Sequence, residues 1–365
     1  MEKSKCGRVG RVPSWTIWLV LALTACAAPA AAQQAQPSRF AIDTAAAIDE
    51  AVDERGNFGN GVIVDAVLSV DLGRGFEALA RPFVQRLSNG EWNRQVWVAA
   101  LRYQRAGRIG LRVDAGLIPP PVGLANLTLR PHLNPTISQP ASLFVPLPPI
   151  EPRGPRANLL GGIYPYGANV TVSGAQWDVR AAIIDTSPLR ARRIFARANP
   201  PQFANVVVGG GITPIVGLRV GASVTHGGWQ RAGESPAITA DRDATVVTVE
   251  SEFSVRYTKV SGEWVRDLLE TAGGDEVASG WWVQGQQTLA PRWFAAARVE
   301  RMTSPSAGPL GTLQDFRFTG VEETIGYRVT PDVTIRAGHR ARRGFFSTGF
   351  DNQLAASVVW WKRWW

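Results

Sequence analysis

The sequence predicts an all-β protein whose strands form a transmembrane antiparallel β-barrel. Apolar and polar residues alternate with a period of two in many short segments, which gives each strand one apolar and one polar face. The connections between these segments are alternately short and long. Such alternation is typical of a membrane barrel, in which turns lie on one side of the bilayer and loops on the other.

The alternation is clear in RWFAAARVER, residues 292–301. Trp293 and Val299 fall on one face of this segment, whereas Arg298 and Glu300 fall on the other. The same pattern recurs in three further segments, 176–185, 217–228 and 332–342. We therefore expect an apolar face towards lipid and a polar face towards an aqueous lumen.

The whole chain yields about sixteen predicted strands. They are 39–50, 61–72, 76–88, 92–105, 108–117, 159–173, 175–186, 204–213, 217–227, 244–253, 256–269, 277–289, 291–303, 314–329, 332–344 and 352–365. The first is the weakest and could be a short helix instead. Residues 316–329 keep their alternation only if a bulge interrupts the strand.

The connections support the barrel more strongly than the strands do. Tight joins alternate with longer connections, which include 118–158, 187–203, 228–243, 304–313 and 345–351. An even number of strands returns both termini to the side of the turns, as in bacterial single-chain barrels.

The N-terminal residues 1–32 are predicted to be an export signal, followed by the barrel over 33–365. Basic residues precede the apolar run WTIWLVLALTA, and a small-residue exit follows, so we expect cleavage after Ala32. The run is too short to anchor the chain. LTAC also resembles a lipoprotein box, in which Cys26 would be lipidated. Since Cys6 and Cys26 both lie here, the barrel has no cysteine for disulfides, thiolate metal sites or nucleophiles.

The chain ends in SVVWWKRWW, residues 357–365. Val359, Trp361 and Trp365 alternate, and this pattern resembles the closing strand of bacterial outer-membrane barrels, which assembly machinery recognises. Arg363 departs from it. The resemblance implies an outer-membrane location, with lipid and the barrel-assembly machinery as partners. Outward aromatic residues are expected in girdles at the membrane interfaces; the candidates are Tyr103, Trp177, Trp264, Trp281, Trp293 and Tyr327.

The architecture further resembles that of general and phosphate-selective porins. Residues 118–158 form the third long loop, and in those porins this loop folds into the barrel and narrows the pore. Eleven prolines should make the loop stiff. The resemblance implies that Arg130, Arg153 and Arg156 lie at the constriction, and that the chain forms a homotrimer.

Sites for catalysis, cofactors or metals are not predicted. The three histidines, His132, His226 and His339, lack metal-ligand spacing, and neither HExxH nor GxSxG occurs. We therefore expect neither an enzyme nor a protein that binds nucleic acid.

Arginine dominates the basic residues, since Lys259 and Lys362 are the only lysines beyond the predicted signal. Six arginines are predicted on lumen-facing positions: Arg112, Arg180, Arg219, Arg298, Arg336 and Arg340. They could raise the local anion concentration. Acids share these faces, so the arginines could instead pair across the lumen; these acids are Asp65, Asp71, Asp114, Asp178, Glu263 and Glu300.

These features predict an outer-membrane channel for passive diffusion of small solutes, with a weak preference for anions. Two alternatives stay open. The apolar loop could plug the lumen and leave a non-conducting barrel that acts as a receptor or scaffold. The chain could also be an exported soluble β-protein that binds a ligand.

Overall fold

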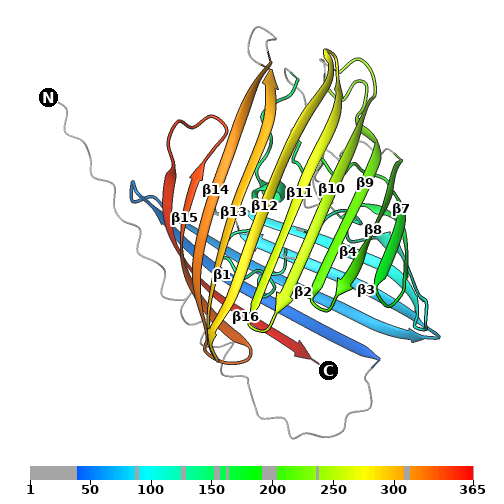
Figure 1. The fold of residues 1–365 in the computed structure, drawn as a ribbon, viewed down its shortest axis with the longest axis vertical. Coiled ribbons are helices and arrows are strands. Elements are labelled where there is room, and N and C mark those ends of the chain that lie inside the picture. The colour runs from blue at the N-terminus through cyan, green and yellow to red at the C-terminus, as the bar shows by residue number, and fades with distance from the viewer. Residues whose placement is uncertain are drawn as a thin grey trace, which may run out of the picture. The chain divides into compact units, whose positions relative to one another are not determined.

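The computed structural model describes residues 39–86, 90–124, 129–151, 157–161, 164–190, 204–235, 238–307 and 313–364. Sixteen strands within these ranges form one closed antiparallel barrel, in which sequence neighbours pair and β1 pairs with β16 (Figure 1). The predicted barrel and its strand number are confirmed. The predicted signal segment lies outside the described residues.

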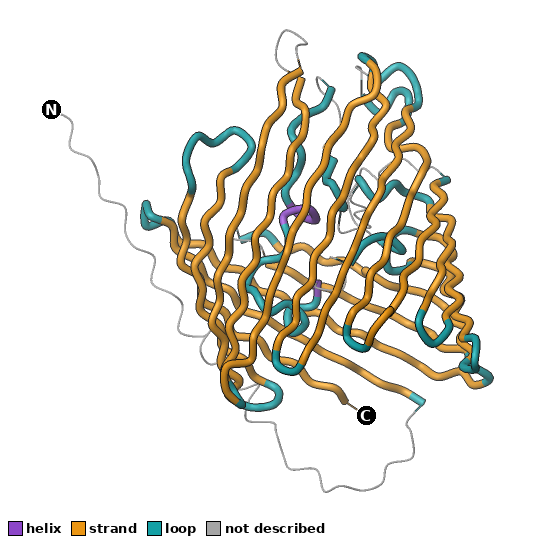
Figure 2. Tube along the Cα trace, in the orientation of Figure 1, coloured by secondary structure: helices purple, strands orange, loops and turns teal. Residues whose placement is uncertain are grey.

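The strands are β1 (Phe40–Asp53), β2 (Phe58–Gly73), β3 (Phe76–Arg86), β4 (Trp92–Arg105), β5 (Gly110–Leu117), β6 (Tyr166–Ser173), β7 (Trp177–Ile184), β8 (Asn205–Ile215), β9 (Leu218–Gln230), β10 (Arg242–Val255), β11 (Thr258–Thr271), β12 (Gly274–Ala290), β13 (Trp293–Ala307), β14 (Leu313–Arg328), β15 (Val333–Arg343) and β16 (Asp351–Trp364). One short helix, α2 (Ala141–Phe144), interrupts the β5–β6 connection (Figure 2). No helix in the described ranges is long and apolar enough to cross a bilayer.

The largest boundary difference concerns β6, which was predicted from residue 159 but begins at Tyr166. Leu159 and Leu160 lie in a turn instead and are almost fully buried in an apolar cluster. Their side chains pack the connection, so the alternating pattern extended the strand too far. The weakest predicted strand is a strand in the structure and runs on to Asp53.

The predicted bulge in β14 is wrong. β14 pairs with β13 and β15 without any shift of register. Phe316 and Phe318 lie on the same face of the strand as buried Glu322. They pack against Phe346 and Phe345 of the β15–β16 connection, with ring centroids 4.9 Å and 6.0 Å apart. The bulge assumed that apolar residues must face lipid, whereas these two contact a loop.

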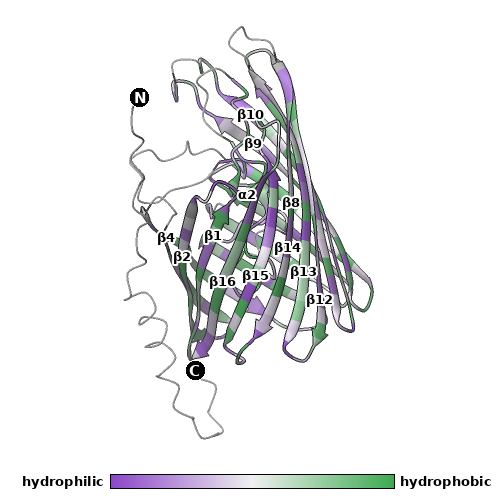
Figure 3. Ribbon diagram, turned by 90° about the vertical axis from the view of Figure 1, so that its left-hand side faces the viewer, coloured by the Kyte–Doolittle hydropathy of each residue, from purple (hydrophilic) through white to green (hydrophobic). Residues whose placement is uncertain are grey.

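The two faces of the strands are arranged in the opposite way to those of a soluble protein. On β9, Val220 and Val224 are exposed while Ser223 and Thr225 are buried, and on β13 Arg298 is 1% exposed. Bands of apolar and polar residues alternate across the strands in Figure 3. A soluble β-protein would bury its valines and expose its charges. The exported soluble protein considered as an alternative therefore does not fit this structure.

The predicted girdle aromatics lie on the outer face. Trp293 packs against Tyr327 near two turns, with ring centroids 4.7 Å apart. Trp264 and Trp281 are directly paired across β11 and β12, and both are exposed. Tyr103 contacts Phe76 next to the β2–β3 turn, and Trp177 is exposed at the start of β7.

The closing strand presents its aromatic residues differently from the prediction. Val359 is buried, and Trp361 Nε1 donates a hydrogen bond to Asp43 Oδ1 at 2.7 Å, so the alternating set that suggested an assembly signal faces inward. Trp365 lies outside the described residues. Trp364 occupies the opposite face, where the Lys362 Nζ lies 4.7 Å from its ring centroid. The inner face offers the Trp361 indole a carboxylate acceptor that lipid could not provide.

Replacing Val208 by arginine tests the assignment of the outer face. Val208 of β8 is 55% exposed on that face, and an arginine near the bilayer midplane should lower the free energy of unfolding by about 2–4 kcal/mol. Val216→Arg is the matched control, because Val216 is 99% exposed in the adjacent turn. Urea unfolding in lipid vesicles measures both variants. Equal stability of the two would contradict a lipid-facing outer surface.

Candidate functional site

Several described residues of the connection between β5 and β6 are hydrogen-bonded to strand side chains. Glu263 of β11 accepts a hydrogen bond from the amide of Leu124 at 2.9 Å, and Glu300 of β13 accepts one from the amide of Ala141 at 2.7 Å. Gly123 has φ of +73°, and a Cβ there would lie 2.0 Å from Glu263 Oε1. A glycine is therefore needed for the backbone to approach this carboxylate.

Glu322 and Arg298 hold the middle of the connection. The Glu322 carboxylate accepts hydrogen bonds from the amides of Ile137 at 2.8 Å and Ser138 at 2.9 Å. Arg298 Nη1 donates to Thr136 Oγ1 at 2.7 Å and to the Ser138 carbonyl at 2.8 Å, while Nη2 lies 3.0 Å from Glu322 Oε2. The ion pair is buried, and both of its members also satisfy loop atoms.

Two arginines of β15 bind the same stretch. Arg336 Nη1 donates to the carbonyls of Asn134 at 2.7 Å and Thr136 at 2.8 Å. Arg342 Nη2 donates to Ser138 Oγ at 2.7 Å. The guanidinium groups thus supply donors for loop oxygen atoms, and Arg342 is found simply by continuing the alternation of the strand beyond Arg340.

The same connection reaches the seam where β1 meets β16. Arg130 forms ion pairs with Asp43 of β1 at 2.7 Å and with Asp65 of β2 at 3.2 Å. The His132 ring stacks on Trp361 of β16, with centroids 5.2 Å apart. The contacts of this one segment therefore extend around the ring from β11 through the seam to β2.

Arg81 of β3 is a site residue that the sequence did not reveal. Its Nε and Nη2 donate to the two carboxylate oxygens of Asp65 at 2.9 and 2.8 Å, and Nη1 donates to the Tyr164 hydroxyl at 2.6 Å. Burial raises the pKa of Tyr164 to about 12. A register shift between Arg81 and Pro82 interrupts the alternation here, which hides the lumen-facing position.

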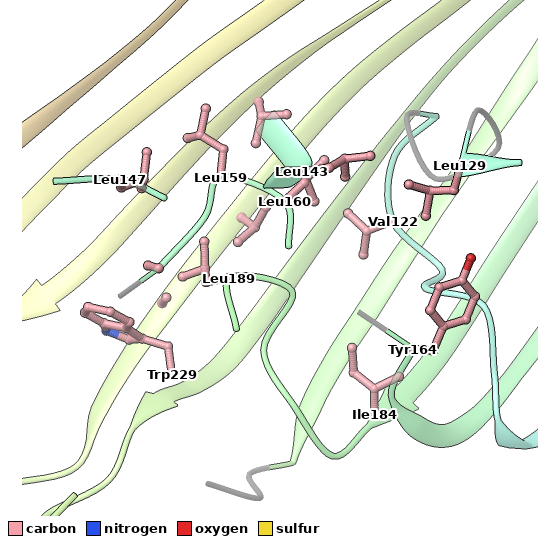
Figure 4. Packing of buried hydrophobic residues seen from close by; sticks show 14 of the residues in the cluster. Val122, Leu129, Leu143, Leu147, Leu159, Leu160, Tyr164, Ile184, Leu189 and Trp229 are labelled. Atoms are coloured by element: carbon pink, nitrogen blue, oxygen red, sulfur yellow. The ribbon is translucent and has the colours of Figure 1, made fainter. Parts of the chain in front are cut away.

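Apolar residues fasten the other part of the connection. Leu143, Leu147 and Leu160 are at most 2% exposed, and they belong to one buried cluster with Leu189 and Trp229 (Figure 4). Burying such side chains stabilises the fold by roughly 1.5–3 kcal/mol each. The connection is therefore held both by charges and by an apolar contact.

Arg180 and Arg219, two predicted lumen arginines, share one acid. Arg219 Nη1 lies 2.7 Å from Glu250 Oε1, and Arg180 Nη2 lies 3.5 Å from the same atom. Arg219 also pairs with Asp178 at 2.9 Å. This cluster on β7, β9 and β10 is separate from that around Arg298.

Arg112 pairs with Asp114 at 2.7 Å, and Arg102 contacts the same carboxylate. Arg340 donates to Gln353, and among the described residues it forms no ion pair. Arg153 and Arg156 lie outside the described residues. Of the predicted lumen arginines, the structure thus brings Arg298, Arg336 and Arg340 near one another, and it brings Arg180 and Arg219 together in a second group.

Space is present next to both sides of residues 131–138. A cavity of about 590 Å³ touches Ser138 and is lined by Asp49, Gln85, Arg340 and Gln353 among others. Another, of about 300 Å³, touches Leu133 and Pro135 and is lined by Glu252, Lys259, Ser261 and Gln284. The tethered segment lies between charged, water-accessible spaces.

No protein-family model and no curated protein matches the sequence. Solved outer-membrane barrels do match the structure. OmpF of Salmonella typhi in complex with daunomycin has a TM-score of 0.60 at 9% identity, over 88% of this chain and 97% of that chain. Outer-membrane expressed OmpT of Vibrio cholerae has a TM-score of 0.58 at 10% identity, over 90% and 100%.

The trimer form of Vibrio cholerae OmpT gives a TM-score of 0.54 at 10% identity, over 88% of this chain and 99% of that chain. Such low identities show the fold alone. The expected porin-like outer-membrane barrel is therefore confirmed as an architecture.

Removing one partner of the buried ion pair should cost more than removing both. Arg298→Met leaves Glu322 buried beside Glu300, which should destabilise the barrel by about 3–5 kcal/mol. Arg298→Met combined with Glu322→Met should lose less stability. Urea unfolding in detergent micelles measures both, with Arg301→Met on the exposed face as the control. A double variant less stable than the single would contradict the pairing.

Acidification should weaken the seam contact of His132. Burial, together with the charge of Arg130, lowers the pKa of His132 from 6.5 to about 4. Neutral His132 contributes its full stabilisation to the folded state above pH 6.5. This stabilisation is lost as the pH falls from 6.5 towards 4, because the unfolded state binds a proton first. His132→Phe retains an aromatic contact with Trp361 but cannot titrate. Wild type should therefore lose more stability than this variant between pH 7 and pH 4, and equal losses would refute the assignment.

Proposed function

We propose that the protein is a channel of the bacterial outer membrane for the passive diffusion of small solutes, narrowed by residues 118–158 and weakly selective for anions. The observation that supports it best is a barrel with an apolar outer face, whose buried charges bind described residues of the β5–β6 connection while cavities persist beside them. Lumen-facing charges require water or partners, since an isolated buried charge is costly. A water-filled lumen supplies the water, and the loop and the neighbouring strands supply the partners.

The tethering favours a fixed constriction. Glu322 and Arg298 bind successive backbone groups of the loop, and Arg336 binds two more carbonyls. Proline-rich backbone between these contacts has little freedom to move. Solutes would then pass a rigid obstacle, so that their size and charge determine the rate.

The anion preference rests on an imbalance of charges near the loop. Arg298, Arg336, Arg340 and Arg342 cluster there, whereas the acids that face them are Glu300, Glu322 and Asp49. Arg298 and Arg336 lie in ion pairs, whereas Arg340 forms none among the described residues and lines the larger cavity together with Arg86, Asp49, Glu50 and Asp53. A single free charge supports only a weak preference.

A non-conducting barrel is the second candidate. The loop contacts strands from β11 through the seam to β2 and buries several leucines, as a plug would. Such a barrel would act as a receptor or scaffold. Recognition of β16 by assembly machinery and a homotrimer, both implied by the resemblance to porins, stay proposals. No catalytic residues are needed for any of these functions.

Conductance in planar bilayers should distinguish a channel from a plugged barrel. Protein purified from outer membranes and shown to be folded should give stable current steps, because the cavities beside the loop would join into an aqueous path. A salt gradient should give a reversal potential of the sign expected for anions. If folded and inserted protein gave no current, the channel would be refuted and the plugged barrel favoured.

Arg340→Gln should move the reversal potential towards cation selectivity, because it removes the free charge beside the larger cavity. Arg301→Gln is the matched control, since Arg301 is exposed on the outer face of β13. An unchanged potential for Arg340→Gln, or an equal shift for the control, would exclude Arg340 as the selectivity determinant.

A further inference from the structure

An ionisable pair lies on the outer face of the barrel among apolar residues. Glu323 of β14 and His339 of β15 are direct cross-strand partners, and both are exposed. Val321 and Ile325 lie on the same face of β14, two positions before and two positions after Glu323. The pair is therefore inside the apolar belt and not at its edge.

On either side of the pair, residues that are paired across neighbouring strands form rows of mostly apolar side chains on the outer face. One row pairs Val283, Val299, Val321 and Ala341, and the row beyond the groove pairs Trp293, Tyr327 and Ile335. The outer faces of β7 and β8 carry apolar residues, among them Val179, Ile183 and Val208, whereas His226 is exposed on the outer face of β9. Arg266 of β11 and Arg301 of β13 are exposed on the outer face as well, but Glu323 and His339 differ from them because an acid and a base lie directly opposite each other.

Small residues surround this pair and form a shallow groove of about 650 Å³ across β12 to β15. Gly285 pairs with Ala297, and Ala297 pairs with Glu323 in turn. Ala295 and Ala337 lie in the next row, on either side of Ile325. Small side chains allow two backbones to approach closely inside a membrane, where polar groups then join them.

The carboxylate of Glu323 has no partner among the described residues. His339 Nε2 lies 3.2 Å from Asn352 Oδ1, which can only accept, so Nε2 is the donor in this contact and Nδ1 donates a second hydrogen bond when the ring is protonated. Lipid chains offer no donor to a carboxylate, and an unsatisfied polar group in hydrocarbon costs several kcal/mol. A protein partner with an exposed donor would remove this cost.

We infer that the outer face of β12 to β15 binds a second copy of this chain through a two-fold contact, in which Glu323 accepts a hydrogen bond from His339 of the partner subunit. The face is self-complementary, because each copy presents an acceptor, Glu323, and a donor, His339. A two-fold axis between the two residues forms the pair twice. The small residues of the groove allow the two barrels to meet closely. This contact requires neither conductance nor anion selectivity.

Cysteine cross-linking in isolated outer membranes tests the contact. Ala337→Cys places a thiol next to the proposed axis, and a bismaleimide of moderate length should link two copies into a dimer. Ala181→Cys is the matched control, because Ala181 is a small, exposed residue on the outer face of β7. Any linkage through Cys6 or Cys26 would appear equally in both. No excess of dimer for Ala337→Cys, or a product with another protein, would overturn the inference.

Charge variants of the Ala337→Cys protein test the pairing itself. Glu323→Ala and His339→Ala should each reduce the dimer several-fold, whereas Glu323→His combined with His339→Glu should restore it, since the two-fold contact is then rebuilt in reverse. The heat-dependent shift in gel mobility shows that each variant is folded. If neither single variant lowered the yield of cross-linked dimer, the proposed pair would be overturned. If the double variant gave as little dimer as the single variants, the two-fold geometry would be overturned.

Discussion

The whole structure depends on closing the sheet. Hydrocarbon offers no hydrogen-bond partner, so every backbone amide and carbonyl in the membrane must be satisfied by a neighbouring strand. Pairing of β1 with β16, from Ile42 opposite Trp364 to Asp53 opposite Gln353, removes the two edges that would otherwise be open. Because side chains alternate along each strand, this closure also separates an apolar exterior from a polar interior.

A polar interior creates a second requirement, since buried charges need partners. The β5–β6 connection supplies such partners, and its own backbone groups receive hydrogen bonds from the same charged side chains. Glu322 accepts hydrogen bonds from loop amides while Arg298 and Arg336 donate to loop carbonyls, so backbone groups and charged side chains satisfy one another there. Such reciprocal contacts explain how an irregular, proline-rich backbone can lie among strands without forming regular structure. They also explain why most lumen arginines are structural and few are free to act on a solute.

The same reasoning applies to the outer surface. An apolar belt is stable against lipid, and an ionisable pair within it is not, unless another protein covers it. Most inner charges are matched within one chain, whereas Glu323 is matched by nothing in the described part of the chain.

The sequence by itself determined the all-β class, the sixteen strands and most of their bounds, because the period of two and the loop lengths follow directly from a membrane barrel. It also predicted Arg298 and Arg336 on the polar faces of their strands, and both side chains are buried. Only the tertiary structure decided which charges meet. Arg81 was hidden by a shift of register at Pro82, and Glu322 gained its role from a loop distant in sequence. Pairing across a closed ring depends on strand register and tilt, which no local pattern of residues encodes.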